Sequence, residues 1–331
     1  MLILHIGTHK TGTSALQTFM TANAGPLLKQ GVRYVKAGRE NRIAHHPLAW
    51  LATGRPNIDP DCWANANKEL ARSREPINIL STEAFWFADP AKVRKYLAYD
   101  GHIRIIAYLR RQDAYLPSLY KQAVTSGRKV TFDIWLQQTG NRGDYYSVLS
   151  QWADAFGDSA IEIRPYERDG ETIDLVKDFI GGLGIDSATL LKRYKSHRRN
   201  QSPRREVLYF IRAFNKLNFS VDQQKLFYSL IKIDKDYIRS SDLLTREQSQ
   251  ELLDRFAEAN RKVEERFWRD AKAPLFPDRP PHDRPPGWTM EDPEFMDLTV
   301  SVLRALLKFT EEQPPMQKRP KLKKPVKKRP G

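Results

Sequence analysis

The sequence predicts an α/β fold built on a central parallel sheet, and three observations lead to this prediction. Short apolar runs alternate, in the first half of the chain, with segments whose apolar residues recur at helical spacing. The first run ends in a glycine-spaced turn that opens a helix, and no further strand-like run follows residue 203. Alternating strands and helices are typical of a sheet that is covered by helices.

Five strand-like runs and several helical segments make up the predicted elements. The runs cover residues 2–6, 32–35, 77–81, 103–109 and 161–165. A helix is expected to start at Asp89, because aspartate caps helices and the proline after it is tolerated at the first helical position. Asp113 is expected to cap a helix that ends near Ser126. Further helices are expected over residues 145–156, 171–180, 203–215, 222–233 and 245–268.

The turn after the first strand has the composition of an anion-binding loop. Gly7 and Gly12 allow backbone N–H groups to converge on one point, and the following helix adds the positive end of its dipole. Lys10 adds a positive charge. The hydroxyl donors of the loop belong to Thr11, Thr13 and Ser14. The sequence therefore predicts a site for a nucleotide-like phosphate.

The position of the lysine separates this loop from the one that binds ATP and magnesium. In the Walker A pattern G-x-x-x-x-G-K-[ST], lysine follows the second glycine and a hydroxyl beside it binds magnesium. Here Thr13 follows the second glycine, and Lys10 lies two residues before it. The runs 77–81 and 103–109 also do not end in the aspartate that a Walker B strand supplies. A magnesium-dependent kinase is therefore disfavoured.

The loop resembles that of the sulfotransferase superfamily, in which K-[ST]-G-[ST]-[ST] holds the 5'-phosphosulfate of 3'-phosphoadenosine 5'-phosphosulfate (PAPS). The matching residues are His9, Lys10, Thr11, Gly12, Thr13 and Ser14. The resemblance implies a P-loop NTPase-like architecture with a helical C-terminal part, and PAPS as co-substrate without a metal. By analogy with phosphoryl transfer, Lys10 is the candidate for stabilising charge on the leaving phosphate.

A second element of the same family follows the run 103–109. In the family, an arginine after this strand and a serine eight residues later hold the 3'-phosphate, and Arg110 and Ser118 have that spacing. Arg111 is either a further neighbour at this phosphate or a residue that faces solvent. The segment 164–167, with the sequence Arg-Pro-Tyr-Glu, is similar to an R-x-Y-E segment of bacterial members. The resemblance covers roughly residues 1–275.

The candidate bases follow the run 77–81. Transfer to an acceptor hydroxyl requires a proton acceptor, and ligands of open α/β folds bind at the carboxyl edge of the sheet. Glu83 lies there and is similar to the glutamate of carbohydrate-type members of the family. His46, with its neighbour His45, is the rival base, because a neutral imidazole suits proton abstraction. The aromatic residues Trp50, Trp63, Phe85, Trp86 and Tyr120 are candidates for lining an acceptor cleft.

Composition limits the class of protein. The chain has 331 residues, of which 40% are hydrophobic, which is enough for a sizeable core. No stretch approaches eighteen consecutive apolar residues and no leader precedes the first strand, so neither a transmembrane segment nor a signal peptide is expected. Cys62 is the single cysteine, which excludes an intrachain disulfide. These features favour a cytoplasmic location.

The predicted organisation has four parts. Residues 1–275 form the sulfotransferase-like domain, within which residues 203–275 are expected to form a helical cap. A proline-rich linker over residues 276–290, an amphipathic helix over 291–313 and a disordered basic tail over 314–331 follow. The formal net charge is +15, and eight lysines and arginines lie within the last fourteen residues. Such a tail is a candidate for contact with polyanions or an anionic membrane surface.

The predicted function is transfer of a sulfuryl group from PAPS to a hydroxyl or amine of a small-molecule or glycan acceptor. A carbohydrate acceptor rests on the family analogy for Glu83 alone. Two alternatives remain open. One is a nucleotide kinase or NTPase with an atypical loop, and the other is a non-catalytic protein whose basic tail and arginines bind a polyanion.

Overall fold

The computed structural model describes most of the first two thirds of the chain and parts of the remainder. The described residues are 1–41, 43–139, 141–168, 171–192, 194–195, 205–216, 243–268, 273–276, 280–281, 299–300 and 302. The expected helix at 222–233, most of the linker at 276–290, nearly all of the helix at 291–313 and the basic tail lie outside these residues. Among the described helices, none has the length and hydropathy that spanning a membrane requires.

A five-stranded parallel sheet forms the centre of the fold, with the order β2-β3-β1-β4-β5. This confirms the predicted α/β class and all five strands. The first strand extends one residue further than expected, and the second ends one residue earlier. The strands are β1 (Leu2–Gly7), β2 (Val32–Tyr34), β3 (Ile77–Ser81), β4 (Ile103–Leu109) and β5 (Ile161–Pro165).

The strand order creates a crevice at one edge of the sheet. The chain leaves the central strand β1 toward β2 and β3 on one side, whereas β4 lies on its other side. In open parallel sheets, ligands bind at the carboxyl ends of the strands where the direction of the connections reverses. Gly7 at the end of β1 pairs in register with Ala107 of β4. The turn after β1 and the residues after β4 are therefore neighbours.

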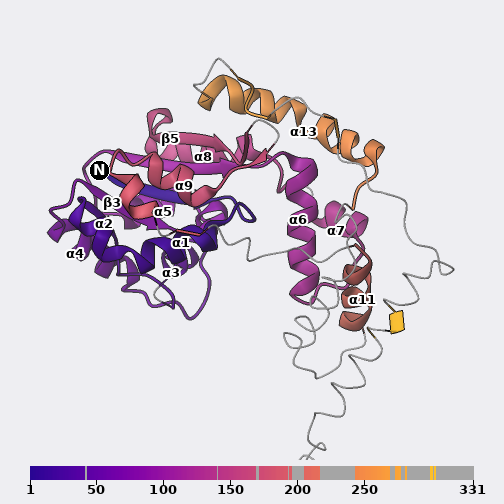
Figure 1. The fold of residues 1–331 in the computed structure, drawn as a ribbon, viewed down its shortest axis with the longest axis horizontal. Coiled ribbons are helices and arrows are strands. Elements are labelled where there is room, and N and C mark those ends of the chain that lie inside the picture. The colour runs from indigo at the N-terminus through magenta and orange to yellow at the C-terminus, as the bar shows by residue number, and fades with distance from the viewer. Residues whose placement is uncertain are drawn as a thin grey trace, which may run out of the picture.

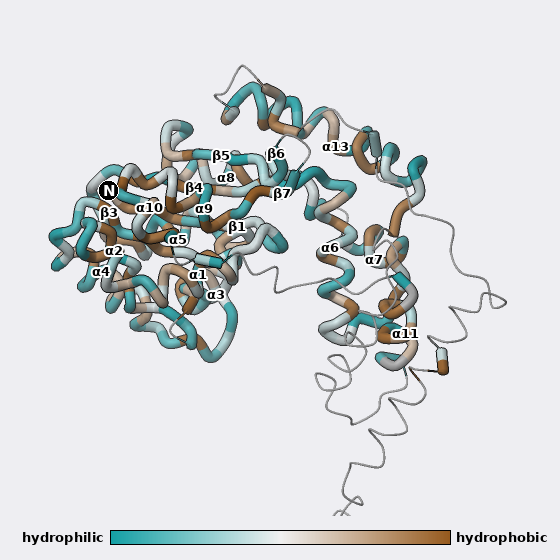
Figure 2. The backbone as a smooth tube through the Cα atoms, in the orientation of Figure 1, coloured by the Kyte–Doolittle hydropathy of each residue, from teal (hydrophilic) through white to brown (hydrophobic). Residues whose placement is uncertain are grey.

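Helices cover both faces of the sheet (Figure 1). One face packs against α1 (Thr13–Ala22), α2 (Ala24–Lys29), α9 (Leu175–Gly181) and α10 (Ser187–Leu191). The other face packs against α3 (His46–Ala52), α4 (Cys62–Arg72), α5 (Pro90–Tyr96) and α8 (Tyr145–Phe156). Figure 2 shows apolar residues concentrated in the strands between these helices. Burial of both faces explains why the strands are continuous apolar runs.

The remaining helices lie beyond the sheet. Figure 1 shows α6 (Gln112–Thr125) running away from the sheet, with α7 (Phe132–Thr139) and α11 (Arg205–Lys216) beside it. The long helix α13 (Arg246–Phe267) packs on α8, on α6 and on β5. A capping box between Thr245 and Gln248 starts it. Helix α11 packs on α6.

Two predicted helix starts differ from the structure. Asp113 does not cap α6, because Arg111 occupies the cap position and holds the Asp113 carboxylate with two nitrogens, at 2.8 and 2.7 Å. The segment predicted as a helix over 171–180 begins instead with the short strand β7 (Glu171–Thr172), which pairs with β6 (Glu167–Arg168). Helix α9 starts only after Asp174, whose carboxylate accepts from two backbone N–H groups.

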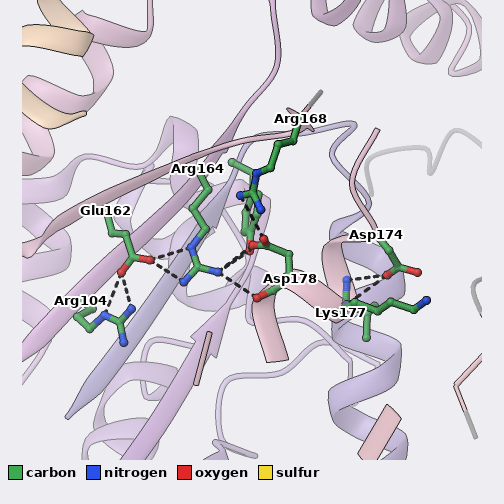
Figure 3. Close-up of polar contacts among 9 residues, drawn as sticks. Arg104, Glu162, Arg164, Arg168, Asp174, Lys177 and Asp178 are labelled. Atoms are coloured by element: carbon green, nitrogen blue, oxygen red, sulfur yellow. Dashed lines mark hydrogen bonds and ion pairs between the residues drawn. The ribbon is translucent and has the colours of Figure 1, made fainter. Parts of the chain in front are cut away.

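A ladder of charged side chains joins β4, β5 and α9 (Figure 3). Arg104 of β4 donates to Glu162 of β5 at 3.0 Å, and Arg164 of β5 donates to the other oxygen of Glu162 at 2.7 Å. Arg164 also donates to Asp178 of α9 at 2.9 Å, and the Tyr108 hydroxyl donates to the same oxygen at 2.6 Å. Burial acts to raise the pKa of Glu162, but the two guanidinium groups outweigh it and hold this pKa below its usual range.

Replacing Arg164 with methionine is expected to destabilise the protein by about 2–3 kcal/mol, because the half-buried Asp178 loses its main cationic partner. Urea unfolding measures this change. Arg261→Met is the matched control, since Arg261 is exposed and its ion pairs with other described residues all lie within α13. Its expected cost is below about 0.5 kcal/mol. Equal costs for the two variants would show that the ladder does not stabilise the fold.

Candidate functional site

The turn between β1 and α1 leaves several backbone N–H groups without an acceptor. Gly12 caps α1 with a positive φ of 85°, a conformation that favours glycine, and its cap carries no side-chain hydrogen bond. Lys10 also has a positive φ, of 63°. Within the described part of the chain, no acceptor pairs with the backbone N–H groups of Lys10, Gly12, Thr13 and Ser14. Such a concave set of donors at a helix start is an anion site.

The hydroxyls of the loop have two different roles. Thr8 donates to the carbonyl of Tyr108 at 3.0 Å, and Thr11 donates to the carbonyl of Thr8 at 2.7 Å. These two buried side chains therefore tie the loop to β4 and hold its shape, so Thr11 does not offer its hydroxyl proton to a ligand. Thr13 is buried and Ser14 is exposed at the first turn of α1. Their hydroxyls donate to no other described residue.

Lys10 and Arg110 bring two positive charges to this loop. Lys10 forms no ion pair with any acidic side chain in the described residues. Burial lowers the pKa of its ammonium, and the positive charge of Arg110 lowers it further. Burial and a nearby arginine both disfavour the charged form of a lysine. An anion bound between the two cations stabilises that form. The structure therefore brings together the two cations that were predicted from separate motifs.

Arg110 is held from one side only. Its Nε donates to the buried carboxylate of Glu167 at 3.4 Å, and its guanidinium carbon lies 5.7 Å from the centre of the Tyr166 ring. The hydroxyl of Tyr166 is also 3.9 Å from the point where a Cβ on Gly12 would stand. Among the described residues, the two terminal nitrogens of Arg110 have no acceptor. They form the planar fork that suits a phosphate or carboxylate.

The sequence also predicted two further residues beside Arg110. Ser118 is half-buried in α6, six residues after the first residue of that helix, which is a rise of about 9 Å. It forms no side-chain hydrogen bond within the described ranges. Arg111 does not face solvent, because it is 6% exposed and binds Asp113 and the carbonyl of Pro280. Arg111 is therefore a structural residue.

Glu83 lies directly beside the loop. It follows β3 and begins the 3-10 helix η1 (Glu83–Phe87), and a Cβ on Gly7 would stand 3.1 Å from its Cα. The amide of Gln17, from α1, donates to its carboxylate at 3.0 Å. Burial acts to raise the pKa of Glu83, but its own backbone N–H, Gln17 and the charges of His46 and His9 outweigh this and lower it. Glu83 is therefore held in its ionised form.

The two histidines of the expected pair have different environments. His45 is fully buried, its Nε2 bonds the carbonyl of Val35 at 2.9 Å, and its Nδ1 accepts from the N–H of Ser81 at 3.1 Å. Burial lowers its pKa to about 3, so it is a neutral structural residue. His46 is half-buried, stacks on Trp50 and bonds the hydroxyl of Thr82 at 2.6 Å. Only His46 of this pair reaches the site.

His9 connects the loop to the side of Glu83. Burial lowers the pKa of His9 to about 4, with the charge of Glu83 acting in the opposite direction. Its Nδ1 is buried and has no hydrogen-bond partner in the described part of the chain. Its ring lies 5.1 Å from the ring of Phe87. His9 is therefore a neutral side chain at the rim of the anion site.

Most of the aromatic residues expected to line an acceptor cleft belong to the core instead. The buried ones, each at most 3% exposed, are Trp63, Phe85, Trp86 and Tyr120. Trp50 is half-buried and remains beside His46. The segment 164–167 does reach the site, through Tyr166 and Glu167. Two site residues that the sequence reading missed are Gln17 and Arg142, which have no motif of their own.

Comparison with known proteins gives limited matches. No family model matches the chain. An uncharacterized protein of Archaeoglobus fulgidus is 33% identical over 198 residues, which cover 56% of this chain and 52% of that protein. The chain thus spans about half the length of this curated relative. The crystal structure of a sulfotransferase from Alicyclobacillus acidocaldarius aligns with 81% of this chain and 96% of its own, at 16% identity and a TM-score of 0.44.

Within the described ranges, no group of three or more His, Cys, Asp and Glu side chains is arranged to hold a metal ion. The donors that do converge are N–H groups, an ammonium and a guanidinium. They bind anions directly.

Replacing Gln17 with methionine is expected to raise the pKa of Glu83, because the ionised carboxylate loses a hydrogen-bond donor. NMR titration of the carboxyl carbon, assigned by comparison with Glu83→Gln, measures this pKa. The lowered pKa also stabilises the fold above the ordinary glutamate value, and this stabilisation is lost as the pH falls through the folded pKa. Gln122→Met in α6 is the control. An unchanged pKa in Gln17→Met would show that Gln17 does not hold the carboxylate.

Proposed function

We propose that this protein transfers a sulfuryl group from PAPS to a hydroxyl or amine of an acceptor. The observation that carries this proposal is the meeting of two anion sites at adjacent strand ends. One consists of the free N–H groups of the loop with Lys10, and the other is the terminal fork of Arg110. PAPS carries anionic groups on its 5' and 3' positions, and such a ligand needs two separate anion sites close together.

The sheet sets the spacing of the two sites. Residues after β1 and β4 follow paired strands, and neighbouring strands are about 4.8 Å apart. The Thr8 N–H also donates to the carbonyl of Tyr108 at 3.1 Å, which fixes the loop to the end of β4. The flexible stems of Lys10 and Arg110 then reach the two phosphate positions of a single nucleotide. In this proposal Lys10 binds at the 5' end and Arg110 at the 3' end.

The proposed reaction is a direct in-line transfer. The bond between sulfur and the bridging oxygen of the 5'-phosphate breaks, while a bond forms between sulfur and the acceptor oxygen or nitrogen. The acceptor proton passes to the carboxylate of Glu83, and the leaving group is adenosine 3',5'-bisphosphate (PAP). Lys10 and the loop N–H groups stabilise the negative charge that develops on the leaving phosphate. Positioned donors of this kind require no reorganisation during the reaction.

The geometry favours Glu83 over His46 as the base. The Thr82 hydroxyl already accepts from the N–H of Ala84 at 3.1 Å, so its own proton has only Nδ1 of His46 as an acceptor among the described residues. In the proposal the Thr82 hydroxyl donates to Nδ1 of His46, so the remaining ring proton lies on Nε2 and this nitrogen is a donor. Glu83 is ionised and accepts protons. In the proposal His46 therefore donates a hydrogen bond to the transferred group or the acceptor.

Calorimetric titration with PAP tests the nucleotide part of this proposal. PAP is expected to bind more tightly than AMP, because Arg110 contacts a 3'-phosphate that AMP lacks. Lys10→Ala and Arg110→Ala are each expected to weaken PAP binding by about 10–100-fold, the value of a charge-assisted hydrogen bond. The expected affinity does not change when a chelator is added.

Two exposed cations provide the controls for this titration. Lys29→Ala at the end of α2 and Arg72→Ala at the end of α4 remove equal charges away from the site. They are expected to change PAP affinity less than twofold. Equal affinity for PAP and AMP would count against the assignment of Arg110. Tight, magnesium-dependent binding of ATP in place of PAP would favour a kinase or NTPase.

A further inference from the structure

An exposed arginine and an exposed phenylalanine stand together at the rim of the anion site. The guanidinium carbon of Arg142 lies 4.9 Å from the centre of the Phe87 ring, and 44% of Phe87 is exposed. The same ring lies 5.1 Å from the ring of His9, in the loop after β1. An aromatic ring of this size is normally buried, so its exposure beside the site suggests contact with a ligand.

Arg142 is placed by packing. Its backbone N–H donates to the carbonyl of Thr139 at the end of α7. The next residue, Gly143, accepts from Gln112 at 3.0 Å, two residues after Arg110. A Cβ on Gly143 would stand 2.8 Å from the ring of Phe256 in α13, so the turn fits tightly between α6 and α13. The base of the Arg142 side chain therefore has a fixed position.

The charge of Arg142 acts on His9, in the loop after β1. The groups that influence the pKa of His9 are Glu83, Arg142, His46 and Lys10, whereas Arg110 is the charged group that influences Lys10. The Phe87 ring that Arg142 covers belongs to the 3-10 helix that Glu83 begins, so this helix links Arg142 to the proposed base.

No carboxylate neutralises Arg142 within the described part of the chain. An arginine that rests on an aromatic ring keeps its edge of N–H donors available, and this edge matches an oxyanion in a bidentate geometry. Phe87 adds an apolar face that suits a sugar or aromatic ring. Together they form a surface that can pair with an oxyanion and pack against a ring. We call this surface the Arg142–Phe87 wall.

We propose that the Arg142–Phe87 wall selects an acceptor that carries its own oxyanion, such as a carboxylate, on a ring bearing the reacting hydroxyl. This proposal rests on the function proposed above, because it assigns the acceptor side of the same site. Arg142 pairs with the oxyanion, and Phe87 packs against the ring. The reacting hydroxyl is thereby brought toward Glu83.

A matched pair of ligands tests this assignment. 4-Nitrophenyl β-glucuronide and 4-nitrophenyl β-glucoside have the same two rings, and they differ in a carboxylate that replaces a hydroxymethyl group. Calorimetric titration of each into the full-length protein saturated with PAP gives their affinities. The glucuronide is expected to bind about tenfold more tightly, as for one charge-assisted hydrogen-bonded pair.

Arg142→Gln is expected to reduce this preference to within about twofold and to leave PAP affinity unchanged. Arg94→Gln is the matched control, because Arg94 is also exposed and lies over an aromatic ring, that of Phe156, at 5.9 Å. It is expected to keep the full preference. Both substitutions lie on the surface, so the fold is preserved.

The outcomes separate this proposal from the one on which it rests. If the wild-type protein does not bind PAP, the proposed function fails. If PAP binds but the two glycosides bind equally, or neither binds at millimolar concentration, the assignment of an anionic acceptor is wrong. If Arg142→Gln weakens PAP as strongly as Arg110→Ala does, Arg142 belongs to the nucleotide and the wall does not select the acceptor.

Discussion

The site depends on one constraint, which is that the N–H groups of Lys10, Gly12, Thr13 and Ser14 have no acceptor among the described residues. Backbone N–H groups are almost always paired in folded proteins, so a cluster left open at a helix start is costly unless a ligand or water binds there. Two buried threonines, Thr8 and Thr11, fix this open shape through bonds to backbone carbonyls. Lys10 faces the same point without an acidic partner in the described residues. An anionic ligand accepts hydrogen bonds from the open N–H groups and also pairs with the charge of Lys10.

The rest of the fold positions the partners of this turn. Placing β1 between β3 and β4 brings Glu83 to one side of the loop and Arg110 to the other. Arg110 is held from behind by Glu167, and the ladder through Arg164 and Asp178 fastens α9, whose Leu175 packs near Gly12. Glu167, Arg164 and Asp178 thus support the site from the side away from the ligand. Among the described residues, the terminal nitrogens of Arg110 have no acceptor, and Lys10 forms no ion pair.

The sheet and the loop could be predicted from the sequence because both are local. Each strand is a continuous apolar run, and the glycine spacing identifies the turn after the first one. Asp113 was misread because a buried arginine next to it competes for its carboxylate. The environments of His45 and His46 depend on β3, and Arg142 reaches the site only because Gly143 packs on α6 and α13. Contacts between residues far apart in sequence have no local pattern, and sequence reasoning could not place them.

A crystal structure of the protein with PAP tests the central claim most directly. The account predicts that the 5'-phosphate lies on the N–H groups that begin α1, in contact with Lys10. It also predicts that the terminal nitrogens of Arg110 bind the 3'-phosphate while its Nε stays on Glu167. A nucleotide bound elsewhere, or one whose two phosphates fail to reach these two groups, would contradict the account.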